Sequence, residues 1–369
     1  MIGFILLGYA VLIGWLVLSK QPPRETTARD NTESVSVVIA YRNEVGNLPQ
    51  LIKEIGAQSI AKSDFELILV NDHSNDGSSE VVKKAIERSE LAIRHFDLKE
   101  KQGKKAAITL GVMKAKFDII LCTDADCGLN PRWMETMLQS FENKETKMVL
   151  AAVQLTGSKG WFQKLQAVEF SSLMAITLLT TRRNRPIISN GANYAFRKTA
   201  FEISEAYVGN SAINTGDDVF LLHSFKRKFG KECVVFSEKE NSVVRTKVKK
   251  TYSSFLNQRI RWASKSKSYK DFDTVKMGGI IFLANLAVLG VFVGALFQYF
   301  SLEFFLGCFL FKWILDLLLL QQLPLFLRPK SIVKGTFLLS MLYPFYSVGI
   351  ALLSLFHRPQ WKGRKIYLV

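Results

Sequence analysis

Four long apolar runs lie at the two ends of this chain, and they constrain its architecture more than any other sequence feature. They occupy residues 2–18, 278–300, 304–326 and 335–356. A helix needs about 20 predominantly apolar residues to cross the hydrocarbon core of a membrane. We therefore expect an N-terminal transmembrane anchor at 1–20, a C-terminal region with two or three transmembrane segments at 278–356, and a polar domain between them.

The composition agrees with a chain that is partly embedded in lipid. Of the 369 residues, 48% are hydrophobic, and the formal net charge is +17. Much of the positive charge lies next to the apolar runs, which favours contact with anionic lipid. A nucleic-acid partner is not expected, because no RNA- or DNA-binding module is present. The four cysteines show no CxxC spacing, which argues against a zinc site or a disulfide framework.

Basic residues beside the apolar runs predict their orientation. Lys20, Arg24 and Arg29 follow the first run and favour the cytoplasm. A signal peptide is the alternative, although no lysine or arginine precedes the run and no small-residue cleavage site closes it. The basic tail at 357–369 also favours the cytoplasm, yet four full crossings would return both termini to the same side. One C-terminal segment is therefore expected not to cross fully, and Pro344 marks the last as a possible kinked or re-entrant segment.

Two charged residues interrupt the third apolar run. Lys312 and Asp316 are four residues apart, so they share one face of a helix. They can pair with each other within that helix, or they can line a polar pathway through the membrane. The sequence leaves both readings open.

The central segment, residues 33–270, alternates between β-rich runs and amphipathic segments. Strands are predicted at 34–41, 65–70, 91–97 and 118–122, with helices at 47–58, where Asn47 is the expected cap, and at 77–90. Such alternation predicts an α/β domain with a mostly parallel sheet covered by helices. Neither a dinucleotide fingerprint nor a Walker loop is present, so any nucleotide must be bound by other residues.

Polar residues follow the predicted strands, in the segments AYRNE (40–44), VNDHSNDGS (70–78), KEKQGKKAA (99–107) and TDAD (123–126). The carboxyl ends of parallel strands meet at one edge of a sheet, where ligands bind. Asp124 and Asp126 share a face of extended chain there, so they can hold a hard cation such as Mg²⁺ or Mn²⁺. A solvated turn is the alternative for this pair alone. Asp72 suits a base and ribose, and Lys104 suits a phosphate.

This ordered series resembles the inverting, membrane-associated family 2 glycosyltransferases with a GT-A fold, near the ceramide glucosyltransferase and hyaluronan or cellulose synthase branch. The matching elements are SVVIAYRNE, VNDHSNDGS, GKKAA, DAD, GDD (216–218) and QRIRW (258–262). The resemblance covers about residues 35–268. It implies sugar transfer from a nucleotide sugar, most often a UDP-sugar, to a lipid or glycan acceptor. It also implies a multi-pass protein of the cell (inner) membrane with its catalytic domain in the cytoplasm.

The resemblance also implies roles for single residues on the donor side. The nucleotide sugar would be bound by Tyr41, Glu44, Asp72, Lys104 and Asp124. Asp126, together with Asp124, would ligate Mg²⁺ or Mn²⁺ beneath the diphosphate. This metal would supply most of the stabilisation of the leaving group.

On the acceptor side, Asp218 would be the general base and Asp217 a supporting alternative. The Q-x-x-R-W match supplies Gln258, Arg261 and Trp262. The segment at 189–198 resembles the lining of the sugar or acceptor pocket. Each of these features also has a simpler interpretation, because acidic residues suit a helix start and QRIRW could be a basic helix on anionic lipid.

Two other functions remain open from the sequence. A processive polysaccharide synthase shares the same series of motifs, although such synthases tend to have more membrane helices. A non-enzymatic membrane scaffold would not need intact carboxylates at Asp124, Asp126 and Asp218. We therefore predict single transfer to a lipid or membrane-associated acceptor.

Overall fold

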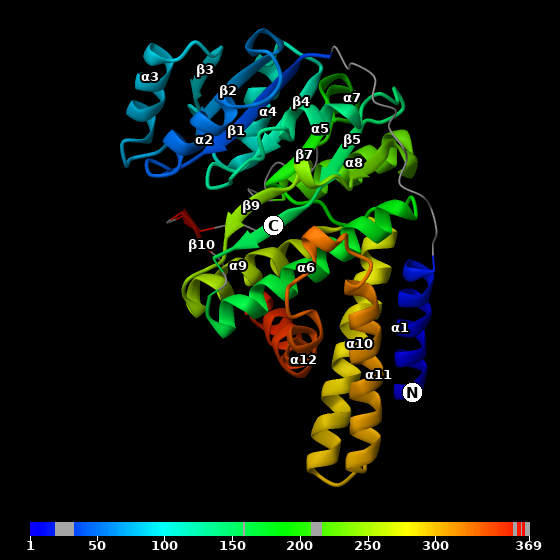
Figure 1. The fold of residues 1–369 in the computed structure, drawn as a ribbon. Coiled ribbons are helices and arrows are strands. Elements are labelled where there is room, and N and C mark those ends of the chain that lie inside the picture. The colour runs from blue at the N-terminus through cyan, green and yellow to red at the C-terminus, as the bar shows by residue number, and fades with distance from the viewer. Residues whose placement is uncertain (19–32, 158, 208–215, 357–359, 363, 366–369) are drawn as a thin grey trace. The chain divides into compact units, whose positions relative to one another are not determined.

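The computed structural model describes residues 1–18, 33–157, 159–207, 216–356, 360–362 and 364–365. The chain forms two compact units (Figure 1). The sheet unit contains residues 22–154, 184–247 and 361–369, and the helical unit contains residues 1–21, 155–183 and 248–360. The orientation signals at Lys20, Arg24, Arg29 and Arg358 lie outside the described residues.

A seven-stranded, mostly parallel sheet forms the core of the sheet unit, with the strand order β3-β2-β1-β4-β7-β5-β8. The strands are β1 Val35–Tyr41, β2 Phe65–Asn71, β3 Ile93–Asp97, β4 Ile119–Thr123, β5 Met148–Ala151, β7 Asn193–Arg197 and β8 Val234–Ser237. Strands β1 to β4 are parallel, whereas β7 runs antiparallel to β4 and β5. The four predicted strands are confirmed, with boundaries that move by at most two residues.

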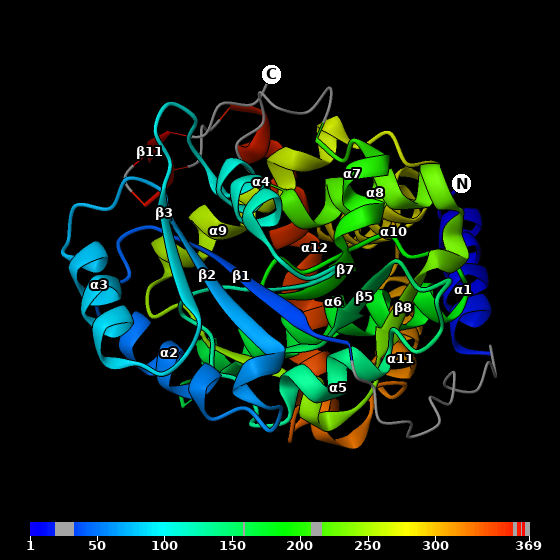
Figure 2. The same ribbon diagram turned by 90° about the horizontal axis from the view of Figure 1, so that it is seen from above.

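Helices cover both faces of this sheet. α2 Leu48–Gly56 and α3 Ser78–Arg88 lie on one face, and α4 Lys104–Lys114 and α8 Asp217–Phe229 lie on the other (Figure 2). Gly111 allows α4 to approach β1 closely, because a Cβ there would lie 2.3 Å from Val38 Cγ1. The remaining short elements are α5 Trp133–Gln139, α7 Lys198–Ser204, β6 Val153–Thr156, β9 Val244–Lys247, and 3₁₀ turns at Lys62–Asp64, Lys231–Cys233 and Glu240–Ser242.

The start of α2 differs from its prediction. Asn47 occupies the N-cap position, but its side chain makes no cap hydrogen bond. Its amide Nδ2 donates instead to Glu44 Oε2 at 2.6 Å. The prediction of an asparagine cap is therefore wrong in its chemistry, because this side chain holds a carboxylate of the loop after β1.

The helical unit is built from long helices. They are α1 Ile2–Val17, α6 Trp161–Arg182, α9 Tyr252–Lys265, α10 Phe272–Leu296, α11 Leu302–Leu320 and α12 Ile332–Phe356, with 3₁₀ turns at Ser266–Ser268 and Leu325–Leu327. α1, α10 and α11 run alongside one another, whereas α12 is seen nearly end-on in Figure 1, so its axis crosses theirs. α12 is one continuous helix with Pro344 inside it, and not a hairpin.

Two helices of the described chain, α10 and α12, are long and apolar enough to cross a membrane by length and composition. α1 is a shorter apolar helix of 16 residues. α11 carries Lys312 and Asp316, whose Nζ and Oδ2 atoms are 2.6 Å apart. The ion pair within this helix, one of the two readings of the sequence, is therefore present.

Candidate active site

The strand order creates a topological switch point between β1 and β4. From β1 the chain moves outward through β2 to β3, and then returns to place β4 on the other side of β1. Open α/β sheets bind ligands at the carboxyl ends of the strands beside such a point. The carboxylates that gather there on the loops and helix starts form what we call the acidic cluster: Glu44, Asp72, Asp124, Asp126, Asp217 and Asp218.

Asp124 and Asp126 directly follow β4. Together with Cys127 they place one ligand atom each within 4.8 Å of one another. Asp126 is exposed, and Asp124 is partly exposed. Burial raises the pKa of the Cys127 thiol well above its usual range, so this sulfur is protonated near neutral pH. The two carboxylates are thus the anionic ligands available here for a hard divalent cation.

Lys104 links the two aspartate pairs of the acidic cluster. It is the first residue of α4, whose N-cap Gly103 has a φ of 96° that favours glycine. The Lys104 ammonium lies 2.5 Å from Asp124 Oδ1 and 3.6 Å from Asp217 Oδ2. Burial disfavours this charge, but the attraction of Asp124 and Asp217 outweighs it and raises the pKa of Lys104. Lys104 is therefore a fixed positive charge between two sets of carboxylates.

Asp217 and Asp218 open α8 and are both buried. The preceding Gly216 has a φ of 81°, which turns the chain sharply into the helix. Asp217 Oδ2 accepts a hydrogen bond from the Tyr194 hydroxyl at 3.2 Å in addition to its ion pair with Lys104. Asp217 is therefore held by contacts with α4 and with β7.

Gly191 lies where the two aspartate pairs meet. Its carbonyl oxygen accepts a hydrogen bond from Lys104 Nζ at 2.7 Å. A Cβ at this position would lie 3.0 Å from that nitrogen and 3.5 Å from Oδ2 of both Asp217 and Asp218. The segment 189–198 singled out in the sequence thus borders the cluster, although neither Gly191 nor Tyr194 was named there individually. A glycine inside a polar segment was the available signal for close approach.

Asp72 and Glu44 form the other end of the acidic cluster. Asp72 is 1% exposed, and its Oδ2 accepts a hydrogen bond from the Gly103 backbone N–H at 3.1 Å. This bond connects Asp72 to the start of α4 and hence to Lys104. Glu44 accepts a hydrogen bond from Asn47, as described above. Both carboxylates also form ion pairs with basic residues of the C-terminal tail, Glu44 with Lys362 and Asp72 with Arg364.

Tyr41 occupies a different position from the other predicted donor-binding residues. It is 2% exposed, and its hydroxyl lies 2.7 Å from His95 Nε2, with which its ring also stacks. Its backbone carbonyl accepts from the Asp72 N–H at 2.8 Å. The side chain therefore packs between β1 and β3, and a role for this ring against the nucleotide stays a prediction that the packing does not support.

The residues of the Q-x-x-R-W match lie on α9 in the helical unit. Gln258 Oε1 accepts a hydrogen bond from the guanidinium of Arg259 at 2.6 Å, and Arg259 stacks 4.3 Å from the ring centre of Trp262. Arg259 is buried and forms an ion pair with Glu169 of α6. Gln258 and Trp262 therefore surround an arginine that the sequence did not single out. Their role at a donor, with that of Arg261, stays a prediction.

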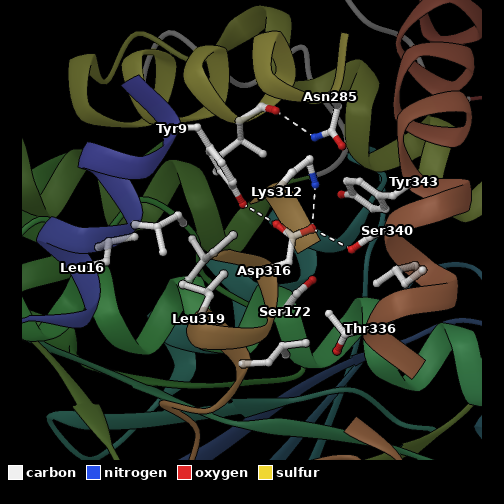
Figure 3. Close-up of a pocket in the computed structure, with 15 residues that line it drawn as sticks. Tyr9, Leu16, Ser172, Asn285, Lys312, Asp316, Leu319, Thr336, Ser340 and Tyr343 are labelled. Atoms are coloured by element: carbon white, nitrogen blue, oxygen red, sulfur yellow. Dashed lines mark hydrogen bonds and ion pairs between the residues drawn. The ribbon is translucent and has the colours of Figure 1, made fainter. Parts of the chain in front are cut away.

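A second polar group lies among the helices of the helical unit, beside a cavity of about 60 Å³ (Figure 3). Asp316 is its centre and accepts from Lys312, from the Tyr9 hydroxyl at 2.6 Å and from the Ser340 hydroxyl at 2.9 Å. These donors come from α1, α11 and α12. The group therefore joins three helices through one carboxylate.

Comparison with known proteins identifies the segment that carries Glu44, Asp72, Asp124 and Asp126 of the acidic cluster, whereas Asp217 and Asp218 lie beyond it. Residues 36–205 match the family model for glycosyl transferase family 2. The chain therefore carries a family 2 glycosyltransferase domain, as its resemblance to that family implied.

Two curated relatives match parts of the chain. The chain is 25% identical over 146 residues to poly-beta-1,6-N-acetyl-D-glucosamine synthase of Staphylococcus aureus (strain MSSA476), which is 39% of this chain and 34% of that one. It is 37% identical over 107 residues to undecaprenyl-phosphate 4-deoxy-4-formamido-L-arabinose transferase of Pseudomonas paraeruginosa, which is 28% and 31% of the two chains. The chain thus matches about a third of the length of these relatives.

The fold also resembles a solved structure. A mannosyltransferase from Pyrobaculum calidifontis, described in complex with GDP-Man and Mn²⁺, superposes with a TM-score of 0.58 at 17% identity. The similarity covers 94% of this chain and 99% of that one. The predicted GT-A α/β fold is therefore confirmed.

Proposed function

We propose that this protein is an inverting glycosyltransferase that moves a sugar from a nucleotide sugar to a lipid or membrane-associated glycan acceptor. One observation carries the proposal: the pairs Asp124/Asp126 and Asp217/Asp218 are separate and are linked through Lys104. Inverting transfer needs one group to stabilise the leaving diphosphate and another to take the acceptor proton. Two sets of carboxylates on either side of the Lys104 ammonium can divide these tasks, one set acting at the diphosphate and the other at the acceptor.

Asp124 and Asp126 would hold the metal ion, Mg²⁺ or Mn²⁺. Their oxygens are hard ligands, which suit such a cation. When bound, the cation supplies positive charge to the diphosphate. Lys104 adds a second positive charge beside Asp124 without any metal.

Asp218 is the proposed general base. A base must accept a proton from the acceptor hydroxyl, and Asp218 is the carboxylate that ends the GDD motif in the first turn of α8. Asp217 Oδ2 contacts Lys104 and Tyr194. Asp217 is proposed to position Lys104, and Asp218 is proposed to act on the acceptor.

The nucleoside of the donor is proposed to lie at Asp72 and Glu44, on the β1 and β2 side of the switch point. A UDP-sugar is the first candidate, and a GDP-sugar is the second because the similar mannosyltransferase is described with GDP-Man. A carboxylate suits the N–H of a base and the hydroxyls of a ribose equally.

A lipid acceptor is supported by two observations. One relative is named as a transferase acting on undecaprenyl phosphate, and α10 and α12 are suited to a membrane. The alternative, a processive polysaccharide synthase, is supported by the relative named as a poly-beta-1,6-N-acetyl-D-glucosamine synthase. The length of the product separates the two functions, because single transfer yields one sugar per acceptor.

The topology proposed for the membrane is three full crossings, by α1 and by two of the three C-terminal helices α10, α11 and α12. Three crossings put the two termini on opposite sides of the membrane. The tail residues Lys362 and Arg364 pair with carboxylates of the sheet unit, so the tail and that unit would share the cytoplasmic side of the inner membrane. Labelling of a cysteine introduced at residue 366 from outside intact cells would contradict this topology.

The proposed function is tested by incubating the purified full-length protein with UDP- and GDP-sugars, Mn²⁺ or Mg²⁺, and extracted membrane lipids. Formation of a lipid carrying a single sugar is the expected result. A ladder of long products would favour the processive alternative. Neither transfer nor donor hydrolysis from any sugar would favour a non-enzymatic scaffold.

A further inference from the structure

The C-terminal tail reaches the acidic cluster through two basic residues. The tail forms a short hairpin of β10 Gln360–Trp361 and β11 Arg364–Lys365, which is drawn in red in Figures 1 and 2. Arg364 Nη1 lies 2.8 Å from Asp72 Oδ1, and Lys362 Nζ lies 2.6 Å from Glu44 Oε1. Both partners belong to the loops that follow β1 and β2.

Backbone contacts also hold the hairpin in place. Lys362 Nζ donates to the carbonyl of Asn43 at 3.1 Å, and Arg42 Nε donates to the carbonyl of Lys362 at 3.4 Å. The same Arg42 donates through Nη1 to the carbonyls of Asp72 and His73 at 2.8 and 2.6 Å. The tail and the loop after β2 are therefore joined to one arginine as well as to each other.

The carboxylate of Asp72 retains capacity for a further donor. A carboxylate has about four lone-pair positions. Arg364 takes one on Oδ1, the Gly103 N–H takes one on Oδ2, and His73 Nδ1 lies 3.1 Å from Oδ1. These contacts with described residues use three positions. Within the described part of the chain, Arg364 thus orients this buried group without filling it, which argues for support of a ligand and against obstruction.

We propose that Arg364 is a positioning residue for the nucleoside end of the donor site, acting through Asp72, and that Lys362 anchors the tail by pairing with Glu44. The ligand class is a nucleoside diphosphate, and the inference rests on the proposed function. Arg364 holds the Asp72 carboxylate in one orientation, so the free lone pair faces a fixed direction. Loss of Arg364 leaves a buried anion without its cation and without that orientation.

The experiment compares variants of the full-length protein in lipid nanodiscs. Binding of UDP and of GDP, each with Mn²⁺, is measured by calorimetry, and donor KM and kcat are measured for the sugar that the enzyme uses. We expect Arg364→Ala to raise Kd and donor KM about tenfold with kcat changed less than about twofold, because a charge-assisted interaction is lost on the binding side. Arg364→Lys keeps the positive charge without the planar guanidinium. Its Kd and donor KM should therefore lie between those of the wild type and those of Arg364→Ala.

Lys62→Ala is the matched control. Lys62 and Glu90 form an ion pair with the same 2.8 Å separation as Arg364 and Asp72, but this pair is exposed. Lys62 precedes β2, so it lies at the end of the strands opposite to the acidic cluster. This variant should bind like the wild type. A thermal melt of each variant separates loss of binding from loss of folding, and a folded Arg364→Ala protein with unchanged or tighter binding overturns the inference. Absence of UDP and GDP binding in the wild type would instead overturn the proposed function and this inference with it.

Discussion

In the helical unit, the buried charges described above are matched by opposite charges: Lys312 pairs with Asp316, and Arg259 pairs with Glu169. In the acidic cluster, by contrast, one basic residue can serve two carboxylates: Lys104 pairs with both Asp124 and Asp217, while Lys362 pairs with Glu44 and Arg364 with Asp72. Both arrangements are buried at least in part, so each carries a desolvation cost. Matched pairs offset that cost within the protein.

The acidic cluster differs from these isolated pairs, because its six carboxylates gather at the carboxyl ends of the strands beside the switch point. Carboxylates gathered in this way attract cations, and a divalent ion with a diphosphate is one ligand that suits them. We therefore expect the isolated pairs to stabilise the fold and the acidic cluster to bind a ligand. Four substitutions test this assignment, in order of decreasing effect on transfer.

The largest effect is expected at Asp126, which is exposed and beside Asp124 in the candidate metal site. Asp126→Ala should reduce transfer to background, because the diphosphate loses its counter-ion. Steady-state assays with Mn²⁺ or Mg²⁺ measure this. Asp64→Ala, an exposed aspartate before β2, is the control. Full activity of Asp126→Ala, or of the wild type in excess chelator, would contradict the metal assignment.

A smaller loss with a different signature is expected at Asp218. Asp218→Asn keeps the shape of the side chain and removes the proton acceptor, so kcat should fall by roughly 10²- to 10⁴-fold while donor affinity is retained. Asp217→Asn should reduce kcat less, because Asp217 is proposed to hold Lys104. Single-turnover rates together with donor binding distinguish the two variants. If Asp217→Asn were the slower and Asp218→Asn near normal, the base would be Asp217.

A moderate loss is expected at Gly191, which touches neither a metal nor a substrate in this account. In Gly191→Val the new side chain meets Lys104 and both aspartates of α8, and we expect turnover to fall about tenfold as these groups shift. Gly46→Val is the matched control, because no atom lies within 4 Å of a Cβ at that position. Equal activity of the two variants would contradict this expectation, because turnover would then not depend on the positions of Lys104 and the two aspartates of α8.

The smallest effect on transfer is expected in the helical unit. Lys312→Met leaves the Asp316 carboxylate without its cation and should lower stability by about 1–3 kcal/mol, with kcat and donor KM within about twofold of wild type. The double variant Lys312→Met/Asp316→Leu removes both charges and should recover most of that stability. Thermal melts and transfer assays decide this. Loss of transfer without loss of stability would favour the polar pathway instead.

The sequence predicted the parts of this fold that depend on local pattern. The first four strands and the carboxylates that follow them were found because alternation and turn residues are local signals. Gly111 against Val38 could not be predicted, since that contact depends on how closely α4 packs on β1. Asn47 was placed at the correct helix end, but its bond to Glu44 is set by the loop.

The parts of the site that the sequence did not predict are long-range contacts. Arg364 and Asp72 are 292 residues apart in the chain, and Arg259 and Glu169 are 90 residues apart. A basic residue in a tail is ordinarily a solvated charge, so nothing local distinguishes Arg364 from Lys365. The contact of Tyr41 with His95 was not predicted either, and the ligand contact that its motif suggested stays a prediction.

The central claim is that the two aspartate pairs do different work, one on the metal and diphosphate and the other on the acceptor. The most direct test is calorimetric titration of UDP and GDP, with and without Mn²⁺, into the wild type, Asp126→Ala and Asp218→Asn. The account predicts that Mn²⁺ strengthens nucleotide binding in the wild type and in Asp218→Asn, and that Asp126→Ala loses this dependence. Equal dependence on Mn²⁺ in all three proteins, or none in the wild type, would contradict it.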